Sequence, residues 1–419
     1  MSRSTWVYLG SYSLSLLGNG VAMVLFPLLV LAKTGDVLAA GLLASITAAV
    51  AAVVGVLAGV VVDRVNRRTV SIISDVMSAA SVAALPIVDA VWGLDLTWFI
   101  VLGVIGAFGD MPGMTARETL LPRLVQLDGG GPGSLDRLVG IRESASGGLM
   151  LLGPGLGGLL VWLIGVDSAT LLITAGMSLA AAMATFAMPS AAGAVVTAES
   201  RAGRGGAGVR GVFADLLSGW RFLLGHRLVL GASLLSAMVV AVMAALQTTV
   251  MPAYFTAENL PELSGFAATG IALGGLISSA VYAAAVGRVR RRTWFVIGAI
   301  GIGIGFTVVG LMAGPWIVLA GAVVVGLANG PMFAALGVAT IEATPDPMRG
   351  RVLGTQNALM LAAPALTAAP IAAIGSHLGL PAAGIGIAAL MVATVVLALM
   401  APAFRSLDTM EPAADAKVG

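Results

Sequence analysis

Charged side chains inside long apolar stretches are the residues of this sequence best placed to do chemistry. Asp110 stands in "GAFGDMPGM", Asp75 lies within another apolar stretch, and Arg142 with Glu143 opens a third. Ionisable groups are costly in a segment that crosses a membrane, and those that occur there commonly form proton relays. We therefore expect Asp110, and after it Asp75, to bind a proton. The alternative is that Asp110 forms a structural ion pair with Arg142 or another arginine.

Uncharged amide side chains fall near the middle of four apolar stretches. They are Asn19, Gln247, Asn329 and Asn357. Such groups either line a central cavity or form ordinary interhelical hydrogen bonds worth roughly 1 kcal/mol each. Methionine and phenylalanine residues near them in the sequence would make the cavity broad and largely apolar, which suits a lipophilic or amphipathic compound better than a sugar.

Several classes of chemistry are excluded by residue type. The sequence contains no cysteine and only two histidines, which argues against a thiolate nucleophile and against a metal site. Its only lysines are Lys33 and Lys417, and neither belongs to a phosphate-binding loop. We therefore do not expect ATP to be the direct energy source for the activity of the protein. The sequence has no recognisable catalytic constellation. We expect no enzyme activity, metal, cofactor or nucleic acid partner.

The elements that must position these residues are membrane helices. Hydrophobic residues make up 58% of the chain and charged residues 10%, against about 25% charged residues in soluble domains. Twelve apolar stretches approach or exceed the roughly 20 residues that a spanning helix needs, and they lack the alternation of barrel strands. They cover residues 6–32, 38–62, 69–90, 96–116, 139–165, 168–189, 228–253, 264–287, 293–313, 316–339, 351–376 and 381–404. The sequence therefore predicts an all-α membrane protein with twelve transmembrane helices.

Basic residues predict the orientation of these helices. With the N-terminus in the cytoplasm, 21 of the 22 lysine and arginine residues lie on the cytoplasmic side and only Lys33 lies outside. The first apolar stretch is too long for a signal peptide, so we expect it to be retained as the first helix. Both termini should be cytoplasmic, in a multi-pass protein of the cell membrane.

Two halves of the chain repeat each other. "VDRVNRRT" (62–69) aligns with "VGRVRRRT" (286–293), and "LMLLGPGL" (149–156) aligns with "LMLAAPAL" (359–366). Each pair falls at the matching helix or loop of its half, as duplication of one helical bundle would leave it. We therefore expect two pseudo-symmetric six-helix bundles.

The domain boundaries follow from composition. A stretch rich in glycine, alanine and arginine separates the halves and resembles a flexible linker. It is followed by apolar residues at helical spacing, which predict an amphipathic helix on the inner leaflet. We expect an N-terminal bundle at 1–190, a cytoplasmic linker with the amphipathic helix at 191–227, a C-terminal bundle at 228–405 and a cytoplasmic tail at 406–419.

Two short motifs resemble those of a known superfamily. "GVVVDRVNRR" (59–68) resembles the loop signature of the major facilitator superfamily, and "GLMLLGPGLGG" (148–158) resembles the Gly-Pro motif in the fifth helix of its antiporters. With twelve spans and an internal repeat, the resemblance covers the whole chain. It implies the major facilitator fold, with alternating access to a central cavity between the two bundles.

The resemblance also gives the charged loop a role. It implies that Asp63 stands against the N-terminal end of the eleventh helix, near 348–354, and latches the two halves together on the inner side. The latch residues are Gly59, Asp63, Arg64, Arg67 and Glu118. Glu118 is the candidate ion-pair partner of Arg67. The alternative is that the arginines, Arg68 included, only fix the topology.

The Gly-Pro motif has two interpretations. Its residues are Gly148, Gly153, Pro154, Gly157 and Gly158. Small residues let helices approach closely, and a proline bends a helix, so packing alone accounts for the pattern. The resemblance adds a pliable seam against the other half that limits leakage during transport.

A narrower resemblance concerns the substrate. "GMTARETLLPRL" (113–124), "SLDRLVGIRE" (134–143) and "RGRVLG" (349–354) look like the Tap-type drug efflux pumps of actinobacteria, linked to tetracycline and aminoglycoside resistance. The resemblance implies export of a drug-like or amphipathic small molecule by proton antiport. The alternatives are an exporter of a siderophore or other metabolite, and a nutrient importer of the same superfamily. The expected partners are this small molecule, protons and the lipid bilayer, and a monomer is sufficient.

Overall fold

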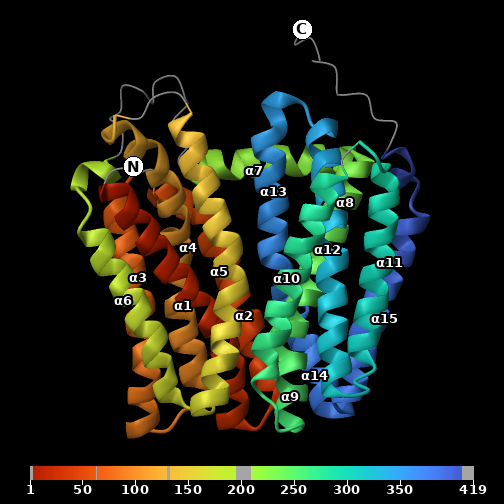
Figure 1. Ribbon diagram of the computed structural model, residues 1–419, viewed down its shortest axis with the longest axis horizontal. Coiled ribbons are helices and arrows are strands. Elements are labelled where there is room, and N and C mark those ends of the chain that lie inside the picture. The colour runs from red at the N-terminus through yellow and green to blue at the C-terminus, as the bar shows by residue number, and fades with distance from the viewer. Residues whose placement is uncertain (1–2, 63, 130–132, 195–208, 286, 408–419) are drawn as a thin grey trace. The chain divides into compact units, whose positions relative to one another are not determined.

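The protein is almost wholly helical. The computed structural model describes residues 3–62, 64–129, 133–194, 209–285 and 287–407, which form helices joined by short turns (Figure 1). Within these ranges twelve helical segments are long and apolar enough to cross a membrane. This confirms the all-α class and the number of spans predicted from the sequence.

The described chain divides into two compact units. Unit 1 comprises residues 1–39 and 46–211, and unit 2 comprises residues 40–45 and 212–419. The helices of unit 1 are α1 (Arg3–Thr34), α2 (Val37–Val62), α3 (Arg67–Val91), α4 (Leu96–Leu127), α5 (Ser134–Ile164) and α6 (Leu171–Phe186), the last preceded by a 3-10 turn at Ser168–Thr170. Within this unit α1 packs against α5 and α6, while α3 packs against α4 and α6.

Unit 2 contains more and shorter helices. They are α7 (Val209–Gly225), α8 (Arg227–Ala245), α9 (Met251–Ala257), α10 (Leu263–Ala284), α11 (Arg291–Gly310), α12 (Pro315–Ala343), α13 (Arg349–Ala362), α14 (Ala368–Leu378) and α15 (Leu380–Met400). Here α12 packs against α10 and α11, and α11 packs against α15. Fully buried aromatic side chains, among them Phe255, Phe295 and Phe306, form the centre of its core.

Capping residues explain where two helices of unit 1 begin. The Asn66 side chain accepts hydrogen bonds from the backbone N–H groups of Arg68 and Thr69, at 3.0 and 3.4 Å, and so caps α3. Asp95 accepts from the N–H of Trp98 at 3.0 Å and caps α4. Each side chain satisfies N–H groups that the first helical turn leaves unpaired. The starts of α3 and α4 are therefore fixed by local sequence.

The structure extends one predicted helix. The extent of the apolar stretch predicted the end of the fourth span at residue 116, whereas α4 continues to Leu127. The added turns carry Arg117, Glu118 and Arg123. Their apolar face is formed by the buried side chains Leu120, Leu121 and Leu124. A helix can extend past its apolar stretch when one face still packs against neighbours. As a result Arg117 lies on the same helix as Asp110.

Two spans of unit 2 are interrupted. Between α8 and α9 the backbone of Leu246–Val250 is π-helical, and between α13 and α14 a 3-10 segment covers Ala363–Leu366. Pro364 has no backbone N–H and cannot continue an α-helix. The hydroxyl of Thr367 donates to the carbonyl oxygen of Ala241 at 2.8 Å and so joins the second interruption to α8. Interruptions of this kind occur often at functional sites of membrane proteins.

Candidate functional site

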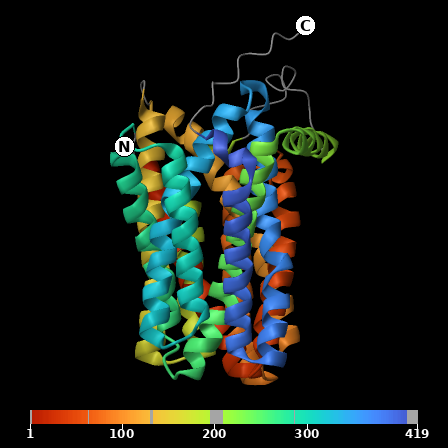
Figure 2. The same cartoon turned by 90° about the vertical axis from the view of Figure 1, so that its right-hand side faces the viewer.

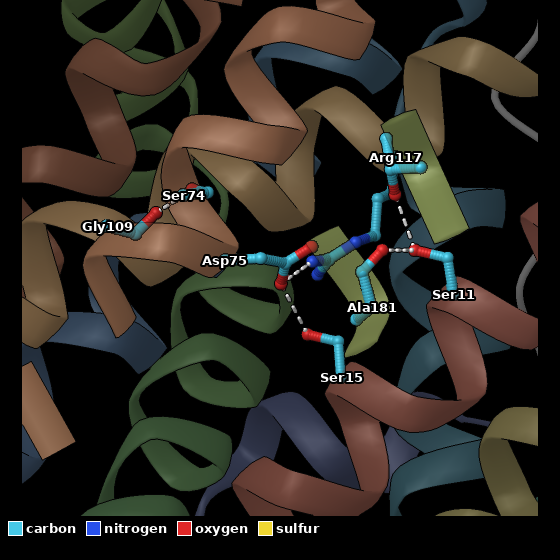
Figure 3. A network of polar contacts seen from close by, with 8 residues as sticks. Ser11, Ser15, Ser74, Asp75, Gly109, Arg117 and Ala181 are labelled. Carbon is cyan, nitrogen blue, oxygen red and sulfur yellow. Dashed lines mark hydrogen bonds and ion pairs between the residues drawn. The ribbon is translucent and has the colours of Figure 1, made fainter. Parts of the chain in front are cut away.

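A buried ion pair lies in the interior of unit 1. The guanidinium of Arg117 on α4 contacts the Oδ1 atom of Asp75 on α3 (Figure 3). The two residues are 6% and 2% exposed, respectively. Ser15 on α1 donates a hydrogen bond to the same Asp75 oxygen at 3.1 Å. Three helices therefore meet at one carboxylate.

Close packing of α3 against α4 holds this pair in place. The Ser74 hydroxyl donates to the carbonyl oxygen of Gly109, which with Gly106 and Gly113 is one of three glycines on the side of α4 that faces α3. A Cβ atom at Gly109 would lie 3.1 Å from the Cβ of Met77, and one at Gly113 would lie 2.7 Å from the Cβ of Ser74. Larger side chains at either glycine would push the two helices apart and separate Asp75 from Arg117.

Hydrogen bonds from α1 complete the frame. The Tyr8 hydroxyl donates to the carbonyl oxygen of Arg117 at 3.1 Å. One turn away on α1, the Ser11 hydroxyl donates to the carbonyl oxygen of Ala181 on α6 at 2.9 Å and contacts the Thr185 hydroxyl at 2.6 Å. The first helix is thus bonded to α3, α4 and α6 along one face, and two of these bonds are made to the residues of the ion pair.

Serine residues extend the polar surface along α3. Besides Ser74, the buried serines on the Asp75 side of this helix are Ser71, Ser78 and Ser81. Their spacing of three and four residues keeps them on one helical face. We call the set the polar seam: Ser71, Ser74, Asp75, Ser78 and Ser81 of α3, Asp110 and Arg117 of α4, and Ser15 of α1. Three buried atoms of the seam have no hydrogen-bond partner among the described residues. They are Ser71 Oγ, Asp75 Oδ2 and Arg117 Nε.

Asp110 belongs to the same seam. It lies two helical turns before Arg117 on α4, and its carboxyl group is hydrogen-bonded to Ser78. The ion pairs formed among the described residues do not include Asp110. Arg142, one of its predicted alternative partners, instead pairs with Glu143 and stands 5.9 Å from the centre of the Tyr12 ring.

The charges of the seam define what it can do chemically. It contains two carboxyl groups, Asp75 and Asp110, and one guanidinium, Arg117. With both carboxyl groups ionised the seam carries a net charge of −1, and with one proton bound it is neutral. Uncompensated charge is expensive away from water. The arrangement is therefore suited to taking up and releasing a single proton.

The predicted latch lies elsewhere, and the structure describes only part of it. Asp63 falls outside the described residues. Arg64 is exposed, and the space around Gly59 is open. The Arg67 guanidinium donates to the carbonyl oxygen of Thr119 at 3.2 Å, next to Glu118, whose side chain is exposed. The latch remains a prediction.

The second copy of the loop contains the ion pair that was expected in the first. In the repeat alignment Arg67 corresponds to Arg291, and continuing the alignment without gaps places Glu118 opposite Glu342. Arg291 on α11 donates to Glu342 on α12 through its two terminal guanidinium nitrogens, Nη1 to Oε2 and Nη2 to Oε1, the second at 2.8 Å. Gly287, which replaces Asp63 in this copy, has a φ of +81°, a conformation that favours glycine.

The Gly-Pro motif forms a tight contact inside unit 1. A Cβ atom at Gly153 would lie 2.8 Å from the Cα of Gly20 on α1, and one at Gly157 would lie 3.1 Å from the carbonyl oxygen of Val21. Gly158 is buried as well, whereas the space around Gly148 is open. The helix α5 runs without interruption through Pro154. This supports the packing interpretation of the Gly-Pro motif. The predicted pliable contact of this motif with the other half remains a prediction.

The four amide candidates have different environments. Asn19 is half-buried, Gln247 lies within the π-helical segment, and Asn357 is exposed. Asn329 on α12 is half-buried, and its Oδ1 atom has no hydrogen-bond partner among the described residues. The neighbour of Asn357, Gln356, is buried and donates to the Ser233 hydroxyl of α8 at 2.6 Å. Gln356 was not among the residues predicted from the sequence.

Arg117 and the serines of α3 were also not predicted from the sequence as site residues. Two signals in the sequence point to them. A carboxylate such as Asp75 inside an apolar helix requires a compensating cation, and Arg117 stands at the end of the apolar part of the adjacent helix. The serines recur at three- and four-residue intervals around Asp75 in "SIISDVMSAAS" (71–81), which marks one helical face.

Comparison with a family model and with solved structures shows which known proteins this chain resembles. The family model of the Major Facilitator Superfamily matches residues 8–271 and 234–417. The solved nucleoside transporter NupG superimposes with a TM-score of 0.76 at 13% identity, covering 98% of this chain and 100% of that chain. The inward-open xylose transporter XylE from E. coli has a TM-score of 0.66 at 14% identity, covering 94% and 95%.

Two curated relatives match this chain over almost its full length and over almost their own. The chain is 30% identical to a protein of Mycolicibacterium fortuitum named multidrug efflux pump Tap, over 93% of this chain and 94% of the relative. It is also 30% identical to the protein of the same name in Mycobacterium tuberculosis (strain ATCC 25618 / H37Rv), over 95% and 93%. The chain is thus a multi-pass cell-membrane transporter and not an enzyme. It belongs to the major facilitator superfamily, among the Tap-type pumps.

Proposed function

We propose that this transporter exports drug-like or amphipathic small molecules in exchange for protons. Its relatives named multidrug efflux pump Tap support the substrate class. Membership of the superfamily supports alternating access, in which the two halves expose one binding cavity to either side in turn. A monomer suffices for such a cycle. An endogenous metabolite is the second candidate substrate.

The observation that carries the proton coupling is the composition of the polar seam. Two carboxyl groups share one guanidinium in the apolar interior of unit 1, so the seam is neutral only when it holds one proton. Because Asp75, Asp110 and Arg117 interact, the proton belongs to the seam rather than to one carboxyl group. We assign both carboxyl groups to the coupling site, with Arg117 as their shared counter-ion.

The seam also supplies a route from protonation to movement. A proton on Asp75 removes the negative partner of Arg117, and the guanidinium is then attracted to Asp110, which lies two turns earlier on α4. Ser15 links Asp75 to α1, so a change at Asp75 alters how α1, α3 and α4 are held together. In this proposal, proton binding and release shift the balance between the two states of the transport cycle.

The predicted latch and amide residues have supporting roles in the same proposal. Gly59, Asp63, Arg64, Arg67 and Glu118 would stabilise the state that is closed on the inner side. Asn19, Gln247, Asn329 and Asn357 would contribute hydrogen bonds to an otherwise apolar substrate cavity. The π-helical segment between α8 and α9, which contains Gln247, supports this role, because a π-helical turn changes which side chains face a neighbouring helix.

Drug-dependent proton flux in inverted membrane vesicles tests the proposal. A pH-sensitive dye should report proton release from wild-type vesicles when an amphipathic cationic drug or a tetracycline is added. Asp75→Asn and Asp110→Asn should each abolish the response at matched expression, because each changes the charge of the seam. Asp136→Asn is the matched control, since Asp136 is an exposed carboxylate at the start of α5.

Each outcome has a defined meaning. If the wild type responds and only the control variant retains the response, drug/proton antiport and the seam assignment both hold. If both seam variants still release protons, the coupling site lies elsewhere. If no drug produces a response from folded wild-type protein, the drug assignment fails, and a panel of exported metabolites should then be tested in the same vesicles.

A further inference from the structure

The helix α7 has a position and a composition that the transport proposal does not use. It covers Val209–Gly225 and ends two residues before α8 begins at Arg227. Figure 2 shows it beside the helices of unit 2, at the level where α8 begins and across their direction. Since α8 starts the seventh membrane span, the end of α7 must lie at the membrane surface. The positive-inside pattern assigns this surface to the cytoplasmic leaflet.

One face of α7 is seated on α13. Gly219 is buried, and a Cβ atom there would overlap the hydroxyl of Thr355 and lie 2.7 Å from the carbonyl oxygen of Arg351. Thr355 is fully buried, and its hydroxyl lies 3.5 Å from the carbonyl oxygen of Leu216. Leu223, one turn after Gly219, is fully buried beside Val352. The two helices are therefore closely packed at this contact.

The opposite face of α7 is apolar and uncovered. Leu217 and Leu224 are 71% and 65% exposed, and Arg221 between them is also exposed. Their spacing of four and three residues places all three on one side of the helix. Two leucines flanking one arginine match a membrane interface, where apolar side chains enter the acyl boundary and an arginine reaches the phosphates.

We propose that Leu217, Arg221 and Leu224 dock α7 onto anionic phospholipid of the inner leaflet, and that the Gly219 contact transmits this anchoring to α13. Continuity with α8 brings the face to the membrane surface, and the charge of Arg221 selects anionic head groups. The α13 helix forms the first half of the eleventh span, so its position enters the transport cycle. The docking stands on the geometry of α7, and only its effect on transport rests on the proposed function.

Spin labels in lipid vesicles test the docking without any transport assay. The chain contains no cysteine, so Leu217→Cys and Leu224→Cys can each be labelled singly in the full-length protein. Val289→Cys is the matched control, because Val289 is an apolar residue, 37% exposed, in the turn before α11 at the same end of unit 2. Labels on α7 should collide more with oxygen than with a water-soluble nickel complex, and the control label should show the reverse.

Two results would overturn the docking. Labels on α7 that are as accessible to nickel as the control label would place this face in water. Labels shielded from both reagents would place it against protein, a second copy included. Neither result depends on whether a drug is transported.

Transport in vesicles with and without phosphatidylglycerol tests the coupling to α13. Wild-type exchange should rise with phosphatidylglycerol, and Arg221→Gln should need about fivefold more of this lipid for half of the effect, since it removes one surface charge. Arg288→Gln, an exposed arginine in the same turn as Val289, should respond as the wild type does. Equal responses of the two variants would refute a role for Arg221.

A substitution at Gly219, in the contact between α7 and α13, distinguishes docking of α7 on lipid from transmission of that docking to α13. Gly219→Ala should lift α7 from α13, so the spin label at Leu217→Cys should stay in lipid while transport loses its dependence on phosphatidylglycerol. Adding Thr355→Ala removes the hydroxyl that the new methyl group overlaps and should restore part of the dependence. An unchanged dependence in Gly219→Ala, measured on folded protein, would refute the transmission.

Discussion

The buried pair of Asp75 and Arg117 allows a quantitative prediction about the stability of unit 1. Removing one partner of a buried ion pair costs about 3–5 kcal/mol, because the remaining charge is uncompensated. Arg117→Gln leaves two carboxyl groups without a cation, whereas Asp75→Asn leaves Asp110 to balance Arg117. We therefore expect Arg117→Gln to be the more destabilising of the two. The double variant should be less destabilised than the sum of the single variants.

Thermal unfolding in detergent, followed by intrinsic tryptophan fluorescence, measures these differences. For a unit of this size about 1 kcal/mol corresponds to a shift of roughly 2–4 °C, so Arg117→Gln should lower the melting temperature by on the order of 10 °C. The double-mutant cycle should give a coupling energy of about 2 kcal/mol or more between the two positions. Additive shifts, or an Asp75→Asn variant that is less stable than Arg117→Gln, would refute the charge balance that we assign to the seam.

Three further predictions concern packing and charge. Gly153→Leu should cost about 1–3 kcal/mol or more, measured as melting temperature, because its Cβ meets Gly20; Gly148→Leu, in open space, should be near neutral, and equal shifts would contradict the contact. Arg291→Gln should cost no more than about 1 kcal/mol in the same assay, since its ion pair with Glu342 is partly exposed; a larger loss would show that the pair is better shielded than its exposure indicates. Lys33→Met should cost a similar amount, because Lys33 holds Asp89 at 2.7 Å at a partly exposed helix end, and a stability equal to that of the wild type would show that this pair contributes nothing.

The sequence was sufficient for the fold because spanning helices leave a strong signal. A run of about 20 apolar residues has few alternatives in a membrane, so twelve spans could be counted directly. Helix ends were less certain where charge and helix coexist. Arg117 and Glu118 marked the end of the apolar run, yet α4 continues past them because Leu120, Leu121 and Leu124 remain buried.

The polar seam could be predicted only in part, since its formation depends on which helix faces which. Asp75 and Asp110 were found because each is a carboxylate in an apolar run. The position of Asp75 relative to Arg117 follows from the pairing of α3 with α4, which Gly109 and Gly113 permit through contacts distant in sequence. The interruption between α8 and α9 was equally hidden, because a π-helical turn has no distinctive composition, whereas Pro364 marks the interruption between α13 and α14 in the sequence.

The two units have diverged in a way that bears on how they divide the work of transport. In the gapless repeat alignment, Asp75 corresponds to Ala299 and Arg117 to Ile341, so the two aligned positions of unit 2 carry no charge. Ala299 is fully buried in the apolar core of unit 2, where a charge would find no partner.

Unit 2 instead carries the two helix interruptions, which α8 brings together through Thr367 and Ala241. A duplicated bundle that kept both features in both halves would have to compensate two buried charge sets and two sets of interrupted backbone hydrogen bonds. In the proposed function, this separation assigns proton binding to unit 1 and the interrupted backbone to unit 2. On this reasoning, substitutions in the seam should alter the proton dependence of transport, whereas substitutions around Gln247 should alter which substrates are accepted. Variants of Gln247 that change proton dependence alone, with an unchanged substrate range, would contradict this division.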